Sequence, residues 1–186
     1  SKSVWMVKRR STRTPPGDYS PLYACCISGF KSVPDIFPQS ILFCCDHNAV
    51  RSPMAEGIMK KLHGKGVYVQ SAGVENDLEI DGFAISVCLE IGVELSRHRS
   101  RSFDEMDKLG DDLSSFDLIV ALSPASQRRA LDLTRFFHLT VEYWPILDPT
   151  GLSENREGKL RAYRQTRDQI YDRLNNRWKT DTMLGI

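Results

Sequence analysis

Residues 41–62 of this 186-residue chain read ILFCCDHNAVRSPMAEGIMKKL: an apolar run, a polar loop and a stretch of mixed character. The run Ile41–Cys45 is typical of a β-strand that is buried on both faces. After the loop, apolar side chains recur at helical spacing, at Met54, Ile58, Met59 and Leu62. Gly64 stands where such a helix would end. The stretch therefore predicts a buried strand followed, through a tight loop, by a helix over 52–63.

The alternation of strand and helix patterns continues along the chain. Further strands are predicted over 66–71, 116–122 and 141–144, and further helices over 83–91, 124–137 and 156–178. Strands that alternate with helices indicate parallel pairing and right-handed crossovers. The expected fold is α/β: an open, mostly four-stranded parallel sheet with helices on both faces, of flavodoxin-like topology. Ligands of such folds bind beyond the carboxyl ends of the strands, here in the loops after Cys45, Ser71, Leu122 and Trp144.

The composition is that of an ordinary soluble globular protein, with 41% hydrophobic and 26% charged residues. A formal charge of +1 gives no reason to expect nucleic acid or an anionic membrane as a partner. No apolar run reaches the length of a membrane span. The five cysteines form two adjacent pairs and a single Cys88, which is not a disulfide framework, so we expect a reducing, cytoplasmic environment.

Three segments are expected. Residues 1–38 are predicted to form an irregular N-terminal extension, because prolines interrupt each window in which a helix could start: Pro15, Pro16, Pro21, Pro34 and Pro38. An organellar transit peptide is an open alternative for this basic segment, and Met6 could be the true start. Residues 39–178 are expected to form the single domain and 179–186 a C-terminal tail. The oligomeric state cannot be predicted from the sequence.

The loop after the first strand has the features of an anion-binding site. Backbone N–H groups between Cys45 and the helix can curl around a phosphate, and the helix N-terminus adds partial positive charge. Arg51 can hold two phosphoryl oxygens in a bidentate fork, and the same field favours a Cys45 thiolate. Ser52 can donate a hydrogen bond to that sulfur, and Asn48 tolerates a left-handed backbone. The expected phosphate-binding loop comprises Asp46, His47, Asn48, Ala49, Val50 and Ser52.

A zinc site at Cys44, Cys45 and His47 is the competing interpretation of this loop. The two spaced pairs of ligands that are usual in structural zinc sites are missing, so no metal is expected. Because successive side chains of a strand point to opposite faces, Cys44 is predicted to pack in the core, away from Cys45.

At this point the chain resembles a known family, the low-molecular-weight protein tyrosine phosphatases, which are related to the thioredoxin-coupled arsenate reductases. Residues 41–62 resemble the first strand, phosphate loop and first helix of the family. Three further segments match in order: Ser71-Ala72-Gly73, His98-Arg99-Ser100-Arg101 and Asp148-Pro149. The resemblance covers about residues 39–177.

The resemblance implies a role for each matched position. Cys45 would attack phosphorus and form a phosphocysteine, Arg51 and the loop amides would hold the phosphate, and Asp148 would act as general acid and base. Ser71 and His98, together with Asn48, would support the loop. No cofactor is implied. The implied partner is a phosphorylated protein, with phosphotyrosine as the expected group, or a small phosphomonoester, and inorganic phosphate is the product.

The chain also departs from the family. Val50 occupies the position of a cysteine that can form a protective disulfide with the nucleophile. Thr150 and Gly151 stand where tyrosine-specific members carry aromatic residues. Three acids near the expected mouth, at Glu75, Asp77 and Glu79, favour a cationic or less acidic substrate, so phosphoarginine is an alternative to phosphotyrosine.

Arsenate reduction is the main alternative activity, and the order His47-Asn48-Ala49 is common among those reductases. Their mechanism needs two further cysteines, usually after the third strand, but residues 121–126 contain none and Cys88 is expected in the core. A phosphate-binding module without catalysis is a third possibility, disfavoured because nucleophile, clamp and candidate acid are all present. The basic run of Arg97, Arg99 and Arg101 is expected to be a solvated edge.

Overall fold

The computed structural model describes residues 37–178. The expectations for the N-terminal extension, including the alternative of a transit peptide, the start at Met6 and the pair Cys25-Cys26, therefore lie outside the described residues, except at positions 37 and 38. The expected tail over 179–186 also lies outside them.

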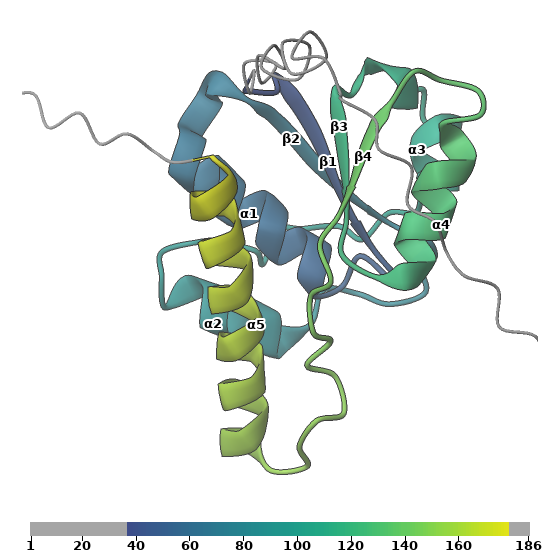
Figure 1. The fold of residues 1–186 in the computed structure, drawn as a ribbon. Helices are drawn as coiled ribbons and strands as arrows, with labels where there is room; N and C mark the ends of the chain where they lie inside the picture. Colours follow the sequence, from purple (N-terminus) through teal and green to yellow (C-terminus); the bar gives the residue numbers. More distant parts are fainter. Residues whose placement is uncertain (1–36, 179–186) are drawn as a thin grey trace, which may run out of the picture. The chain divides into compact units, whose positions relative to one another are not determined.

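The core of the described region is a four-stranded parallel sheet in the order β2-β1-β3-β4 (Figure 1). Its strands are β1 (Ser40–Cys45), β2 (Tyr68–Gly73), β3 (Leu118–Ala121) and β4 (Thr140–Tyr143). β1 lies between β2 and β3, so the chain leaves it to one side and later returns on the other. The carboxyl end of β1 is therefore the switch point in strand order, where an α/β sheet opens a crevice for a ligand.

Helices cover both faces of the sheet (Figure 1), which confirms the predicted fold class. One face packs against α1 (Arg51–His63), α2 (Gly82–Leu89) and α5 (Arg156–Arg177), and the other against α3 (Phe103–Lys108) and α4 (Pro124–Leu133). Side chains of β1 alternate between these layers: Phe43 and Cys45 point to the α1 side, and Leu42 and Cys44 to the α4 side. The predicted separation of Cys44 from Cys45 is confirmed.

The bounds of several helices and strands differ from those predicted from the sequence. The second strand was predicted over 66–71 but begins at Tyr68, because Gly64–Gly66 form a 3-10 turn. It extends to Gly73, which pairs with Cys45. The fourth helix ends at Leu133 rather than at residue 137. The short helix α3 was not predicted, because six residues give too little periodicity; its signal is Ser102, whose hydroxyl caps the backbone of Glu105.

No helix among residues 37–178 is long and apolar enough to cross a membrane. The long helix α5 instead packs against α1 and α2. Its inward side chains Tyr163, Ile170 and Leu174 are buried in the same core as Ile58 and Met59 of α1. This packing anchors α1, whose first turn carries Arg51.

Candidate active site

The loop that joins β1 to α1 forms the floor of the candidate site. Cys45 ends β1 with only 2% of its surface exposed, and α1 begins six residues later at Arg51. Val50 occupies the N-cap position, and no side chain in the described part of the chain caps the first turn. Its backbone N–H groups and the helix dipole therefore make this end of α1 suited to an anion.

Asn48 shapes this loop. It is the only residue other than glycine with a positive φ among residues 37–178, at 53°, as its residue type suggested. Its buried amide group donates to the hydroxyls of Ser52 and Ser71, both at 2.9 Å. Its Oδ1 accepts from the backbone N–H of Arg101 at 2.9 Å and from Nε2 of His98 at 3.1 Å. The structure thus brings both predicted supporting residues, Ser71 and His98, to the loop.

Ser52 directs its hydroxyl at the sulfur of Cys45. The Ser52 Oγ lies 3.0 Å from Cys45 Sγ and 3.3 Å from the carbonyl oxygen of Ala72. Because Ser52 Oγ accepts from Asn48, its single proton is available to one of these two acceptors. An anionic thiolate is a stronger acceptor than a carbonyl, so ionisation of Cys45 favours donation to the sulfur.

Glu56, one turn further along α1, extends this network beneath the loop. Its carboxylate is buried and accepts a hydrogen bond from Ser71. It also pairs with Lys60 and lies 3.8 Å from Nδ1 of His98. The sequence analysis missed Glu56, because a carboxylate inside an amphipathic helix is normally assigned to the solvent face.

Arg51 lies between two carboxylates and is 5% exposed. Its Nη2 is 2.8 Å from Asp148 Oδ2 and also pairs with Asp46. Its Nη1 donates to the carbonyl oxygen of Ile146 at 3.3 Å. The guanidinium group is therefore fixed from the loop that follows β4 as well as from its own loop.

Asp46 has a role that its place in the loop did not predict. Its second oxygen accepts from the hydroxyl of Ser123 at 2.7 Å. Ser123 forms the capping box of α4 with Ser126, and Ser126 in turn donates to the carbonyl oxygen of Cys44. Asp46 therefore links Arg51 to the start of α4, on the opposite face of the sheet from α1. Only the local pattern Ser-Pro-x-Ser at 123–126, typical of a helix start, hinted at this link.

Asp148 faces Arg51 from the loop after β4, as predicted. Its Oδ1 accepts from the backbone N–H of Thr150 at 3.0 Å and from the Thr150 hydroxyl, which holds the carboxylate in place. Thr150 thus orients Asp148. A cavity of about 170 Å³ brings the predicted catalytic residues together. It is lined by Cys45, His47, Ala49, Val50, Arg51, Leu78, Glu79, Asp81, Asp148 and Thr150.

Asp81 is a further residue of this cavity that the sequence analysis missed. Its backbone N–H donates to the Ala49 carbonyl oxygen at 3.0 Å, and its carboxylate caps α2 at Phe83. The carboxylate also accepts from the Tyr163 hydroxyl at 2.9 Å. Burial, followed by the contact with Asp81, raises the pKa of Tyr163 well above its usual value, so the phenol donates throughout the physiological range. Asp81 therefore ties the loop between β1 and α1 to α2 and α5.

His47 turns toward two acids of the following loop rather than toward a cysteine pair. Its Nδ1 lies 2.6 Å from Asp77 and 4.0 Å from Glu75. The donor atoms of these three side chains lie within 4.8 Å of one another, a spacing that could hold a divalent cation. The zinc interpretation of Cys44, Cys45 and His47 fails geometrically, because Cys44 points into the opposite core layer.

Two cysteines outside the loop lie in the core. Burial raises the pKa of the Cys88 thiol to about 12, and burial raises the pKa of Cys44 further above its usual value. Both are fully buried, so neither is a nucleophile under physiological conditions. The predicted core role of Cys88 is confirmed.

A cysteine and an arginine six residues apart, at the carboxyl end of the central strand of a parallel sheet, place the chain among α/β proteins with a phosphate-type anion loop. The family model described as low molecular weight phosphotyrosine protein phosphatase matches residues 40–180. The chain belongs to this family.

Relatives of the chain carry more than one activity in their names. An arsenate reductase of Oceanobacillus iheyensis is 31% identical over 134 residues, which cover 72% of this chain and 91% of the relative. Among solved structures, an arginine phosphatase from Geobacillus stearothermophilus has a TM-score of 0.59 at 25% identity, covering 75% and 90% of the two chains. An arsenate reductase from Archaeoglobus fulgidus has a TM-score of 0.55 at 27% identity, covering 73% and 96%.

Replacing Gly73 tests the close packing of β2 on the loop. A Cβ on Gly73 would lie 2.2 Å from the Glu75 carbonyl oxygen and 2.8 Å from the backbone nitrogen of Asn48, so Gly73→Ala must displace the loop. We expect kcat/KM for para-nitrophenyl phosphate to fall about 100-fold, the usual cost of misplacing a reacting group by about 1 Å. Gly82→Ala is the control, because its Cβ meets nothing within 4 Å. Equal activity of the two variants would contradict this packing argument.

His98 predicts a pH dependence of stability. Burial lowers its pKa below the ordinary value, with the Glu56 carboxylate acting in the opposite direction. Protonation therefore favours the unfolded chain, so His98 destabilises the fold as pH falls below about 6.5. We expect the free energy of unfolding, measured in urea at pH 7 and pH 5, to fall less for His98→Gln than for wild type. His138 is exposed, so His138→Gln is the control. If the free energy of unfolding fell as much in His98→Gln as in wild type between pH 7 and pH 5, the prediction would be contradicted.

Proposed function

We propose that this chain is a phosphatase that hydrolyses phosphomonoesters through a phosphocysteine intermediate on Cys45. The observation that carries the proposal is the convergence of Cys45, Arg51 and Asp148 on one cavity at the end of β1. Membership of an enzyme family that includes phosphatases and arsenate reductases supports it.

In the first step, the Cys45 thiolate attacks phosphorus in line with the leaving oxygen. The S–P bond forms as the ester P–O bond breaks, and Asp148 transfers its proton to the leaving oxygen. The equatorial oxygens meet the backbone N–H groups of the loop and the guanidinium group of Arg51, which stabilise the charge of the transition state. Ser52 stabilises the thiolate before attack and again when sulfur is the leaving group.

In the second step, water attacks the phosphocysteine. Asp148, now a carboxylate, accepts a proton from this water, the P–S bond breaks, and inorganic phosphate leaves with the thiolate restored. Thr150 supports this double role, because it holds Oδ1 of Asp148 and leaves Oδ2, the oxygen beside Arg51, to face the leaving group and then the water.

Hydrolysis of para-nitrophenyl phosphate in the presence of EDTA tests the mechanism. We expect Cys45→Ser to abolish turnover, and Asp148→Asn to lower kcat by about 100-fold or more, as for loss of a general acid. Cys88→Ser is the control, because this core thiol does not line the cavity at Cys45. Turnover that persists in Cys45→Ser would contradict the phosphocysteine mechanism.

Arsenate reduction is the second candidate, favoured by the relatives named arsenate reductase. The reduction of arsenic(V) to arsenic(III) takes two electrons, which Cys45 and a second thiol would supply by forming a disulfide, and a third thiol would then carry that disulfide away from Cys45. Residues 37–178 contain Cys44, Cys45 and Cys88 only, and Cys44 and Cys88 are buried with raised pKa values. Arsenite production by the wild-type chain, given arsenate and a dithiol reductant, is therefore measured alongside its phosphatase activity. Arsenite production without phosphatase turnover would replace the proposed function by this one.

The residues at the rim of the cavity indicate which leaving group the substrate carries. Glu75 and Asp77 face His47, so of the three rim acids only Glu79 lines the cavity, beside Asp81. Among the described residues that line it there is no phenylalanine, tyrosine or tryptophan, so a phosphotyrosine ring gains little stacking there. These features support phosphoarginine, whose guanidinium group makes it less acidic than phosphotyrosine, as the alternative substrate.

The choice between these substrates is tested with Glu79→Gln. If the substrate is phosphoarginine, we expect kcat/KM for a phosphoarginine peptide to fall about threefold, the range of one exposed ion pair, with phosphotyrosine turnover unchanged. Glu75→Gln removes the same charge beside His47 and serves as the control. Equal effects of both variants on both peptides would rule out a specific role for Glu79.

A further inference from the structure

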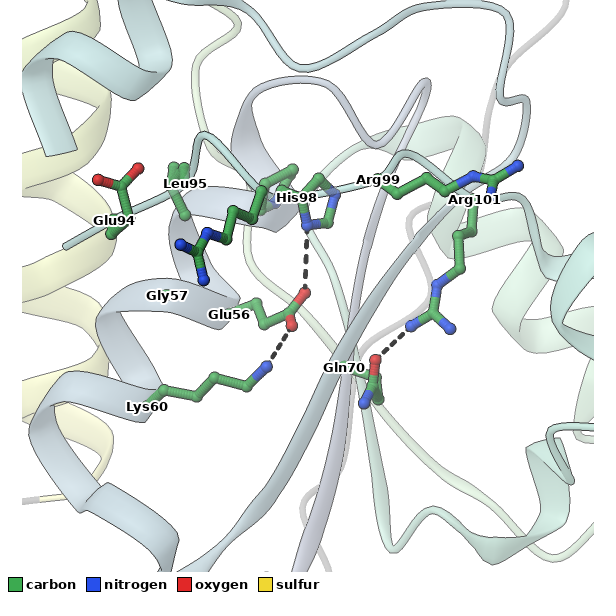
Figure 2. Close-up of a pocket in the computed structure, with 11 residues that line it drawn as sticks. Glu56, Gly57, Lys60, Gln70, Glu94, Leu95, His98, Arg99 and Arg101 are labelled. Atoms are coloured by element: carbon green, nitrogen blue, oxygen red, sulfur yellow. Dashed lines mark hydrogen bonds and ion pairs between the residues drawn. The ribbon is translucent and has the colours of Figure 1, made fainter. Parts of the chain in front are cut away.

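A second cavity lies beside the phosphate loop, between α1, β2 and residues 94–101 (Figure 2). Its volume is about 470 Å³, within the range of small-molecule sites. None of the residues that line it also lines the cavity at Cys45, so the two are distinct.

The walls of this cavity are basic. Four cationic side chains line it, against the two carboxylates Glu56 and Glu94: they are Lys60, Arg97, Arg99 and Arg101. His98 is also in the wall, and its lowered pKa leaves it neutral at physiological pH. The cavity therefore carries an excess of positive charge, and its cationic side chains come from α1 and from residues 97–101.

The four cationic side chains differ in whether they have hydrogen-bond or ion-pair partners. Figure 2 shows Lys60 turned to Glu56 on one side and Arg101 turned to Gln70 on the other, and Arg101 also pairs with Asp111. The guanidinium groups of Arg97 and Arg99 make no hydrogen bond or ion pair with any residue that the structure describes. Two planar donor groups beside a cavity are thus available to a ligand, and guanidinium groups bind phosphate in a bidentate manner.

We propose that this cavity is an effector site for a small molecule that carries two or more phosphate groups. The spread of the four cations over α1 and residues 97–101 matches separated anionic groups better than a single ion. The proposal is independent of the function assigned to Cys45, because it concerns binding at other residues.

The cavity wall is also the support of the phosphate loop. His98 and the backbone N–H of Arg101 both donate to the Asn48 side chain, and Ser100 donates to the Asn48 carbonyl oxygen at 2.9 Å. On the opposite wall, Glu56 reaches Asn48 through Ser71. A ligand that contacts Arg97 and Arg99 restrains the segment that holds Asn48, and so acts on the loop without touching it.

Tripolyphosphate is the probe for this site. Calorimetric titration uses the full chain with Arg51→Ala, which removes the phosphate clamp, at about 150 mM salt to screen non-specific attraction. We expect binding that weakens about tenfold or more when Arg97→Gln and Arg99→Gln are added, since charge-assisted bidentate contacts are lost. The control adds Arg128→Gln and Arg135→Gln, which remove the same charge from exposed positions in and after α4. The proposal is overturned if the two pairs of substitutions weaken tripolyphosphate binding equally, or if the Arg51→Ala chain does not bind tripolyphosphate.

Amide NMR spectra of the same proteins locate the binding. We expect tripolyphosphate to shift the signals of residues 94–101 and of Asn48 in the Arg51→Ala chain, and these shifts to vanish with Arg97→Gln and Arg99→Gln. Shifts in wild type that are confined to residues 45–52 overturn the site. Shifts at 94–101 without any change at Asn48 overturn its role as an effector site. If Arg51→Ala does not fold, as judged by circular dichroism, wild type with and without the Arg97 and Arg99 substitutions gives the same decision on the site.

Discussion

The side chain of Asn48 is the constraint on which the candidate site depends. Its two amide hydrogens go to Ser52 and Ser71, and its oxygen accepts from His98 and Arg101. A buried amide with all its hydrogen bonds made allows only one arrangement of its partners, because each alternative leaves a polar group unsatisfied. The left-handed backbone at Asn48 turns the loop, and the side chain then locks that turn to α1, β2 and residues 98–101.

Local patterns predicted the parts of the structure that are local in the chain. The apolar run of β1, the helical spacing of α1 and the residue type of Asn48 each identified the correct conformation. The fold class followed from the order of elements, because alternating strands and helices leave few topologies. The positions of Ser71 and His98 came from the family resemblance, and the structure places both against Asn48.

Contacts between distant segments were beyond such patterns. The pair Asp46 and Ser123 is separated by 77 residues and depends on how β1 and β3 align. Glu75 and Asp77 were expected to meet substrate, yet they face His47, because side-chain directions in a loop follow no period. The solvated edge expected at this basic run is confirmed for Arg97 and Arg99, which are exposed, whereas Arg101 is half-buried and pairs with Asp111. All three side chains also border a cavity, which the sequence did not indicate. The sequence carries no sign that α1 and β2 form its other walls.

The position of Arg51 between Asp46 and Asp148 has a consequence for turnover. Any phosphate that binds there must exchange part of an existing ion pair for its own contact, so the net gain is smaller than that of a free guanidinium group. This exchange weakens the hold on inorganic phosphate, which has no leaving group and no further contacts to offer. A substrate with contacts along the rim recovers that loss, whereas the product does not. In the proposed phosphatase reaction, this geometry would limit product inhibition and favour rapid release.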